Sequence, residues 1–351
     1  MREQRSLAAV TVSADDRRVR VRMLPTYEVI RESPAGTWPQ VGSAVPRLLV
    51  PPLLDLRSPD ACVFVDSKDS RLHHVPLDGR PPSVLDDVSW PSPVNADGTK
   101  TPRTVAGDGR AVAVGGRITT TEGRRFDIDG GSAAVRALAP TPDGFLVARE
   151  DGRDWTCERL VVTRDDVRVA WRVAWTAPEW LAPGSNARFD ASYFTRIAPM
   201  LSQQQPLVLL LPAADKAAPW ITRVELNGDR TPIAQDWFDE DLPATIVDDE
   251  LSYFSFGKAR RVVLKANAQP AAWIDGKQIA SRLGGIPDTK ADWVVAIEPQ
   301  AQAALVRVEH LPDASTAFDL ALVSRDGAGV ERTRLWARES VGDWLVPLLD
   351  S

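Results

Sequence analysis

Residues that commonly build metal or disulfide sites are scarce in this sequence. It contains two cysteines, Cys62 and Cys157, and three histidines, His73, His74 and His310. The cysteine pair gives neither a disulfide framework nor a metal-ligand spacing. His73 and His74 are adjacent, so in a strand their side chains would point to opposite faces and make a poor joint metal site. We therefore expect no metal centre.

Long apolar runs and a basic charge balance are missing as well. No segment approaches the roughly 18–20 apolar residues that a membrane-spanning helix needs. The first residues also lack the apolar run of a secretory signal. The net charge of -6 at pH 7 argues against general binding to nucleic-acid phosphates. These absences predict a cytoplasmic protein that binds neither nucleic acid nor membrane.

Catalytic and cofactor motifs are not recognisable. The sequence has no Gly-x-Ser-x-Gly elbow, no Gly-rich phosphate loop in the Rossmann or Walker spacing, and no EF-hand loop. A catalytic triad stays open as an alternative, because its members are distant from one another in sequence. We expect no catalytic residues and no cofactor.

Short strands separated by turns are the pattern that is present. The 28 prolines and 22 glycines are spread throughout and leave little room for long helices, of which 188–204 is the best candidate. In 18–23 three arginines alternate with two valines and a methionine, which is the period of a half-buried strand.

The stretch 167–173 alternates in the same way. One predicted face holds Val167, Val169, Trp171 and Val173, and the opposite face holds Arg168 and Arg172. Further strand-like runs of similar length include 61–65, 111–116, 145–149, 159–163, 207–211, 261–266, 293–298 and 304–310. The pattern indicates an all-β chain.

Hairpin turns recur at a regular distance. Asp-Gly and Asn-Gly dipeptides are the strongest short hairpin signal, because both residues tolerate positive φ. Those that close a strand-like stretch begin at Asp78, Asp129, Asn227, Asp275 and Asp326. They are separated by about 50 residues or twice that distance, which suits a four-stranded propeller blade with its loops. We therefore predict an all-β fold with a single β-propeller of about six or seven four-stranded blades; tandem β-sandwiches are the alternative.

The repeated unit of strand, polar turn and strand ending in Asp-Gly resembles degenerate WD-repeat-like propellers. The closest stretches are 58–79 and 141–163, although the family's defining Gly-His and terminal Trp-Asp dipeptides are absent. The resemblance covers about residues 58–335 and concerns the architecture only, and we predict a single propeller domain over residues 1–351. The resemblance also implies that the ring is closed by pairing of the chain ends, with strands 7–12 or 18–24 beside a C-terminal strand at 332–338.

The densest charged feature is the acidic run 236–250, which contains seven acids and no base. Such a run is commonly a solvated loop, and carboxylates of this kind can also build a metal or general-acid site. An aromatic anchor with an acidic rim would instead suit a basic surface of a partner protein. The residues predicted to bind that partner are Trp237, Phe238, Asp239, Glu240 and Asp241.

The arginine face of 18–22 permits two interpretations. Arg18, Arg20 and Arg22 could clamp an anion. They could equally be charges on an exposed edge strand that discourage pairing with another chain.

These observations favour a non-enzymatic scaffold for protein–protein interaction, or an adaptor subunit of a larger bacterial-type intracellular assembly. The alternative is a propeller hydrolase or lyase whose central site is lined by carboxylates from several blades.

Overall fold

The structure is a computed structural model of the chain, and it describes seventeen segments of it. They are residues 6–36, 46–67, 71–90, 101–128, 133–152, 154–176, 196–198, 207–211, 220–225, 227–237, 244–255, 258–272, 289–299, 303–310, 317–324, 330–336 and 339–348. All regular secondary structure in these segments is β-strand. No helix in them is long and apolar enough to cross a membrane.

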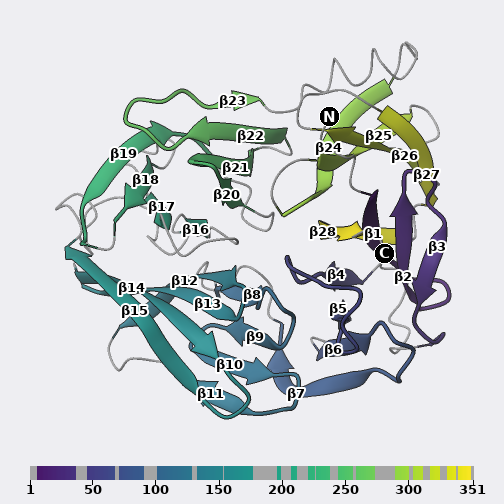
Figure 1. The fold of residues 1–351 in the computed structure, drawn as a ribbon, viewed down its shortest axis with the longest axis horizontal. Helices are drawn as coiled ribbons and strands as arrows, with labels where there is room; N and C mark the ends of the chain where they lie inside the picture. Colours follow the sequence, from purple (N-terminus) through teal and green to yellow (C-terminus); the bar gives the residue numbers. More distant parts are fainter. Residues whose placement is uncertain are drawn as a thin grey trace. The chain divides into compact units, whose positions relative to one another are not determined.

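The chain divides into two compact units. Unit 1 comprises residues 1–87, 256–260 and 272–351, and unit 2 comprises residues 88–255 and 261–271. In both units most strands lie beside the strand that precedes or follows them in the sequence (Figure 1).

Unit 1 contains the sheets formed by the two ends of the chain. The N-terminal strands are β1 (Ser6–Ser13), β2 (Val19–Leu24), β3 (Val29–Glu32), β4 (Arg47–Leu49), β5 (Cys62–Ser67), β6 (Arg71–Pro76) and β7 (Ser83–Ser89), whose last residues lie past the unit boundary. The C-terminal strands are β24 (Thr289–Ile297), β25 (Ala303–His310), β26 (Ala317–Ser324), β27 (Val330–Trp336) and β28 (Glu339–Leu348).

Unit 2 contains the central sheets. Their strands are β8 (Arg103–Val105), β9 (Ala111–Val114), β10 (Arg117–Thr120), β11 (Arg125–Asp127), β12 (Ala134–Thr141), β13 (Gly144–Asp151), β14 (Asp154–Val162), β15 (Val167–Thr176), β16 (Arg196–Ala198), β17 (Leu207–Leu211), β18 (Trp220–Val224), β19 (Arg230–Gln235), β20 (Thr245–Val247), β21 (Glu250–Ser255), β22 (Lys258–Val263) and β23 (Ala271–Ala272). The first residues of β22 belong to unit 1.

Five sheets have four strands, and one has the order β27-β26-β25-β24-β28-β1-β2-β3. In that sheet β24 and β28 are joined by one parallel pair, Ile297 and Trp344, whereas β1 pairs antiparallel with both β28 and β2. It therefore consists of two four-stranded blades. The described residues form seven blades, so the predicted all-β class and four-stranded propeller blades are confirmed.

The N-terminal strand β1 lies between β2 and the C-terminal strand β28 (Figure 1). Segment 332–338, which was expected beside the N-terminal strands, lies largely in β27 and pairs with β26 instead. The C-terminal strand that pairs with β1 is β28. It is difficult to recognise in the sequence because it contains Gly342 and Pro347, residues that strand interiors usually lack. Gly342 is required by close packing, since a Cβ there would lie 2.2 Å from Cγ2 of Val50.

The predicted helix over 188–204 is wrong where the structure describes it. β16 occupies Arg196–Ala198 and pairs with β17, while the rest of that segment lies outside the described residues. The short β17, with its continuous apolar sequence, needs a neighbouring strand on each side for its backbone hydrogen bonds. This tertiary requirement overrides the weak local preference of residues 196–198.

The sheet β12-β13-β14-β15 buries apolar side chains on both faces. On one face Trp155 and Trp175 stack with ring centroids 6.1 Å apart. On the other face Phe145, Val147 and Leu160 pack against residues of β9 and β10. The two faces follow from the alternation of side chains along each strand. The second cluster fixes this blade against the blade β8–β11, and both blades belong to unit 2.

Candidate functional site

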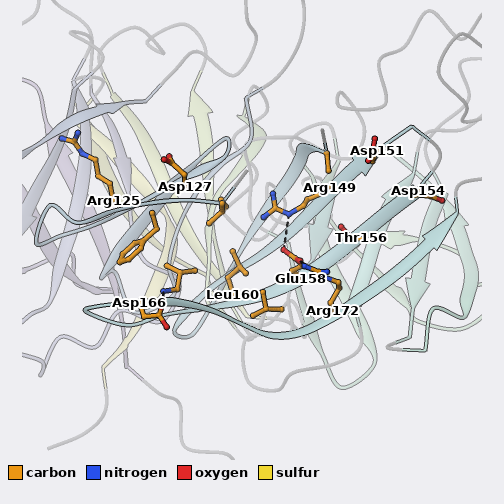
Figure 2. Close-up of a pocket in the computed structure, with 15 residues that line it drawn as sticks. Arg125, Asp127, Arg149, Asp151, Asp154, Thr156, Glu158, Leu160, Asp166 and Arg172 are labelled. Atoms are coloured by element: carbon orange, nitrogen blue, oxygen red, sulfur yellow. Dashed lines mark hydrogen bonds and ion pairs between the residues drawn. The ribbon is translucent and has the colours of Figure 1, made fainter. Parts of the chain in front are cut away.

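Unit 2 contains a groove between β11 and the outer strands of the blade β12–β15. Its cavity volume is about 750 Å³. The residues that line this β11/β15 groove are Arg125, Phe126, Asp127, Ile128, Ala133, Arg149, Asp151, Asp154, Thr156, Glu158, Leu160, Asp166, Val167, Val169 and Arg172 (Figure 2).

Strand register brings the polar residues of the groove floor together. Arg149 of β13 is directly opposite Thr156 of β14. Glu158, two residues further along β14, is directly opposite Arg172 of β15. Because residues two apart in a strand share a face, all four side chains lie on the groove side of the sheet.

A β-bulge places Arg172 on that face. Between Arg159 and Leu160 the pairing with β15 shifts, so that Trp171 and Val169 become the successive partners and Ala170 is the additional residue. Val169 and Arg172 both line the groove. The prediction that they lie on opposite faces is therefore wrong, because a bulge breaks the alternation on which it depends.

The floor of the groove is a buried network of opposite charges. Nε of Arg149 donates to Oε2 of Glu158 at 3.2 Å, and Nε of Arg172 donates to Oε1 of the same carboxylate at 2.6 Å. The side chains of Arg149 and Glu158 are only 8% and 5% exposed, whereas that of Arg172 is 62% exposed. Two guanidinium groups therefore share one buried carboxylate.

One nitrogen of this network has no hydrogen-bond partner. Nη1 of Arg149 is buried and forms no hydrogen bond within the structure. A buried N–H of a charged group that is left unsatisfied is costly, so its presence requires a physical explanation. The groove that Arg149 lines offers one, because a bound group could accept this hydrogen bond.

Apolar and acidic residues surround that floor. Phe126, Ile128, Leu160, Val167 and Val169 form an apolar strip along the groove, and Val169 is 49% exposed.

The rim of the groove is acidic. Asp127 is 74% exposed and pairs with Arg117 at 3.0 Å, and Asp154 accepts a hydrogen bond from Thr176 at 3.0 Å. Asp151 and Asp166 are exposed as well. The rim thus presents these carboxylates, together with the exposed Arg125, to solvent above a positively charged floor.

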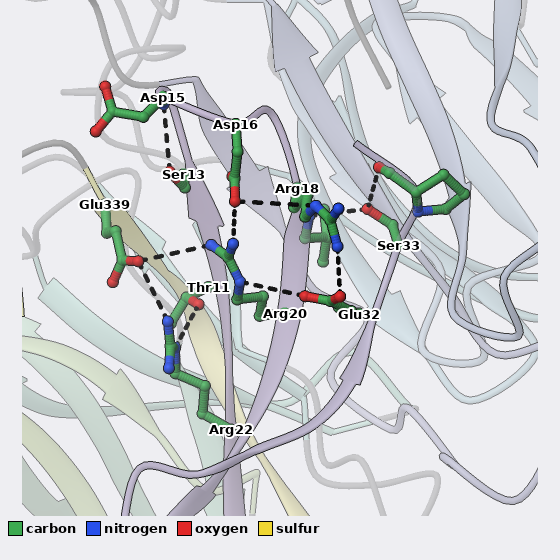
Figure 3. A network of polar contacts seen from close by, with 12 residues as sticks. Thr11, Ser13, Asp15, Asp16, Arg18, Arg20, Arg22, Glu32, Ser33 and Glu339 are labelled. Atoms are coloured by element: carbon green, nitrogen blue, oxygen red, sulfur yellow. Dashed lines mark hydrogen bonds and ion pairs between the residues drawn. The ribbon is translucent and has the colours of Figure 1, made fainter. Parts of the chain in front are cut away.

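The arginine face predicted in 18–23 forms a different kind of site, the arginine ladder of unit 1. It consists of Arg18, which precedes β2, of Arg20 and Arg22 on β2, and of the carboxylates Asp16, Glu32 and Glu339 (Figure 3). Arg20 lies 3.8 Å and Arg22 lies 3.2 Å from the Glu339 carboxylate. Each arginine has an acidic partner within the unit.

This pairing supports neither of the two interpretations of the arginine face. β2 lies inside its sheet, between β1 and β3, so these arginines do not protect an exposed edge. The three carboxylates also balance their charge. The arginine ladder therefore holds β2, β3 and β28 together and lacks the net positive charge that an anion clamp requires.

Of the residues predicted to bind a partner, the structure describes Trp237, which is half-buried. Phe238, Asp239, Glu240 and Asp241 lie outside the described residues. The neighbouring Asp236 is buried and accepts hydrogen bonds from the Tyr253 hydroxyl and, at 2.9 Å, from the Trp237 backbone N–H. At least this acid of the run stabilises the fold.

Two further acids of the run form a hairpin turn. Asp248 and Asp249 have φ of 48° and 59° and connect β20 with β21. Aspartate tolerates this left-handed conformation better than most residues do. The Asp249 carboxylate also lies 3.5 Å from Nη1 of Arg223. The acidic run thus forms a hairpin turn and an ion pair in unit 2.

The side chains of Cys62, Cys157, His73 and His74 lie in the described part of the chain, and both cysteines are free and buried. His73 is buried, while the partly exposed His74 lies 3.4 Å from the Ser83 hydroxyl. Burial, together with the nearby Arg80 charge, lowers the pKa of His74. Within the described residues, no group of three or more His, Cys, Asp or Glu side chains could hold a metal ion.

The blades define the class of this chain as a β-propeller. No known protein-family model matches the sequence, and no curated protein matches it either. The specific resemblance to WD-repeat propellers is therefore not established at the level of a family.

Solved structures with similar folds include a functionally unknown protein from Desulfotomaculum acetoxidans, with 12% identity, coverage of 97% of this chain and 98% of that chain, and a TM-score of 0.48. A protein from Lactobacillus plantarum has 11% identity, coverage of 98% and 100%, and a TM-score of 0.44. A quinonprotein alcohol dehydrogenase-like protein from Bacteroides thetaiotaomicron has 7% identity, coverage of 97% and 78%, and a TM-score of 0.47. At such identities and scores these proteins indicate nothing about what this chain binds.

Proposed function

We propose that this protein is a non-enzymatic scaffold or adaptor that binds another protein in the β11/β15 groove. The observation that supports this most directly is the composition of the groove, an apolar strip with charged residues around it. Protein interfaces have this arrangement, with an apolar centre that is shielded from water and a polar rim. The adaptor role within a larger bacterial-type assembly, and a WD-repeat-like relationship, are parts of the same proposal.

The outer strand of the blade adds a second argument. β15 has ten residues, is the last strand of its sheet, and exposes Val169 beside the groove. A long edge strand with an exposed β-branched residue offers both backbone hydrogen-bonding groups and apolar surface to a partner. Val169 is the most exposed of the large apolar residues in the described part of the chain.

The acidic rim indicates a partner with basic side chains. Asp127, Asp151, Asp154 and Asp166 surround the groove, and complementary charges would orient an approaching partner. Trp237 and the four residues that follow it are a second proposed contact for the same kind of partner.

A photo-crosslinking experiment tests the location of the binding face. A photoreactive amino acid is placed at Val169 in the protein expressed in its native host, and the crosslinked product is identified. The matched control has the same amino acid at Val29, which is 43% exposed on the last strand of another sheet. We expect a specific crosslinked partner from position 169 and none from position 29.

A substitution then connects that partner to the groove. Val169→Asp should reduce recovery of the partner at least tenfold, whereas Val29→Asp should leave it unchanged, because only the first change places a charge in the apolar strip. Equal crosslinking from both positions, or none from position 169, would refute the proposed binding face.

A further inference from the structure

We infer that the groove receives an acidic side chain of the partner, and that Nη1 of Arg149 is the donor that binds its carboxylate. This inference rests on the proposed function and specifies the chemistry of the partner segment. The partner's carboxylate would accept the hydrogen bond that this buried nitrogen does not form within the protein.

The charge of the floor favours an anion. Arg149 and Arg172 contribute two positive charges and Glu158 contributes one negative charge, so the network has a net charge of +1. Arg149 is 8% exposed, so water screens its charge poorly. One additional carboxylate would neutralise the floor, and a second would exceed what the floor can balance.

The geometry leaves Nη1 of Arg149 as a buried donor for that carboxylate. Nε of Arg149 is occupied by Glu158, while Nη1 has no acceptor. Arg149 lines the groove, and Figure 2 shows its guanidinium group above Glu158 with the hydrogen bond between them. Hydrogen bonds from a guanidinium group to a carboxylate are among the strongest in proteins, especially away from water.

The surroundings favour an acid within a protein segment over a free anion. A small di- or trianion would pass the rim carboxylates Asp127, Asp151, Asp154 and Asp166 against their repulsion. A segment with one acidic residue between lysines would place the positive charges at the rim and the carboxylate on the floor. Its apolar side chains would contact the strip of which Val169 is part.

Thr156 provides a way to occupy Arg149 from within the protein. It lines the groove directly opposite Arg149 in the strand register. A glutamate at this position would reach the guanidinium group and act as an internal substitute for the partner's acid. Thr156→Gln is the matched control, because glutamine has the same size as glutamate and lacks its charge.

The probe is a blocked seven-residue peptide in which lysine and valine alternate around a central glutamate. The control peptide has glutamine in the centre. Binding of each to the full chain is measured by calorimetry. We expect the glutamate peptide to bind about tenfold more tightly or better, which is the effect of one hydrogen bond to a charged group. The preference should disappear in Arg149→Met and persist in Arg168→Met, which removes an exposed arginine of β15 in the same sheet.

If Arg149→Met fails to fold, Thr156→Glu tests the role of Arg149 in its place. We expect Thr156→Glu to have a higher thermal midpoint than Thr156→Gln and to lose the preference for the glutamate peptide. The inference is overturned if the two peptides bind within twofold of each other, if neither binds, or if the two Thr156 variants behave alike. Binding of inorganic phosphate or succinate as tightly as the glutamate peptide would also overturn it, and would indicate a small-anion site.

Recovery of the partner that crosslinks at Val169 distinguishes failure of this inference from failure of the proposed function. If Val169→Asp loses that partner while Thr156→Glu and Thr156→Gln retain it equally, the protein-binding groove stands and the role of Arg149 is wrong. If position 169 gives no specific crosslink, the proposed function itself fails.

Discussion

Glu158 is the residue whose removal should destabilise the blade β12–β15 most specifically. Its carboxylate is 5% exposed and accepts hydrogen bonds from both Arg149 and Arg172. Glu158→Gln preserves the size of the side chain and removes its negative charge. The floor of the β11/β15 groove would then contain two positive charges without a counter-ion.

The magnitude follows from which arginine is buried. Removal of one partner from a buried ion pair costs about 3–5 kcal/mol. Arg172 is 62% exposed and remains solvated, so the cost comes mainly from Arg149. We therefore expect a loss near the lower limit, about 3 kcal/mol. Glu32→Gln is the control, because Glu32 is 44% exposed and also pairs with two arginines. Loss of such a surface pair should cost less than about 1 kcal/mol.

Urea unfolding followed by tryptophan fluorescence measures the difference. Trp155 and Trp175 stack on the opposite face of the same sheet and report on its unfolding. A double variant, Glu158→Leu with Arg149→Leu, should regain most of the stability, because apolar residues can replace a buried ion pair without loss. A midpoint for Glu158→Gln that equals or exceeds that of Glu32→Gln would refute the reasoning.

Three further predictions concern single residues. Gly342→Ala should destabilise the protein by about 1–3 kcal/mol in the same unfolding assay, because the new methyl group would overlap Val50, and Val50→Ala should recover part of the loss. Cys157 should not react with a thiol reagent at pH 8 until the protein is unfolded, because complete burial raises the pKa of its thiol; modification at the same rate with and without urea would contradict this. The pKa of His74, followed by NMR, should lie below the ordinary value of 6.5, because burial opposes its protonation. Since the unfolded chain then takes up the proton first, stability should fall as the pH decreases from about 6.5 towards the folded-state pKa, and a pH-independent midpoint in this range would contradict the shift.

Local patterns were sufficient to predict the fold class and its repeating unit. Alternation in 18–23 and hairpin signals such as Asp78-Gly79 are short-range features, and the structure has β2 at the first and a turn with positive φ at the second. The period near 50 residues then follows from the physical size of four strands with their connections. These features depend on neighbours in sequence, so the sequence alone is enough to find them.

The groove could not be predicted, because it depends on a bulge and on pairing between strands. Strict alternation in 167–173 separates Val169 from Arg172, whereas the register shift at Ala170 places both on one face. Arg149 and Glu158 are nine residues apart and meet only when β13 and β14 form their hairpin. Arg149, which directly follows the apolar run 145–148 of β13, was the one signal in the sequence.

Pairing of β1 with β28 also has a consequence for synthesis of the protein on the ribosome. The β1 residues Ala9 and Val12 are fully buried, and each pairs with one residue of β2 and with one residue of β28, which lies more than 300 residues later. At a translation rate of about 5–20 residues per second, β28 is synthesised roughly 15–65 seconds after β1. During that time β1 is an unpaired apolar edge, the kind of surface on which chains aggregate. Synthesis of β28 therefore determines when the exposed edge of β1 is covered and can no longer pair with another chain.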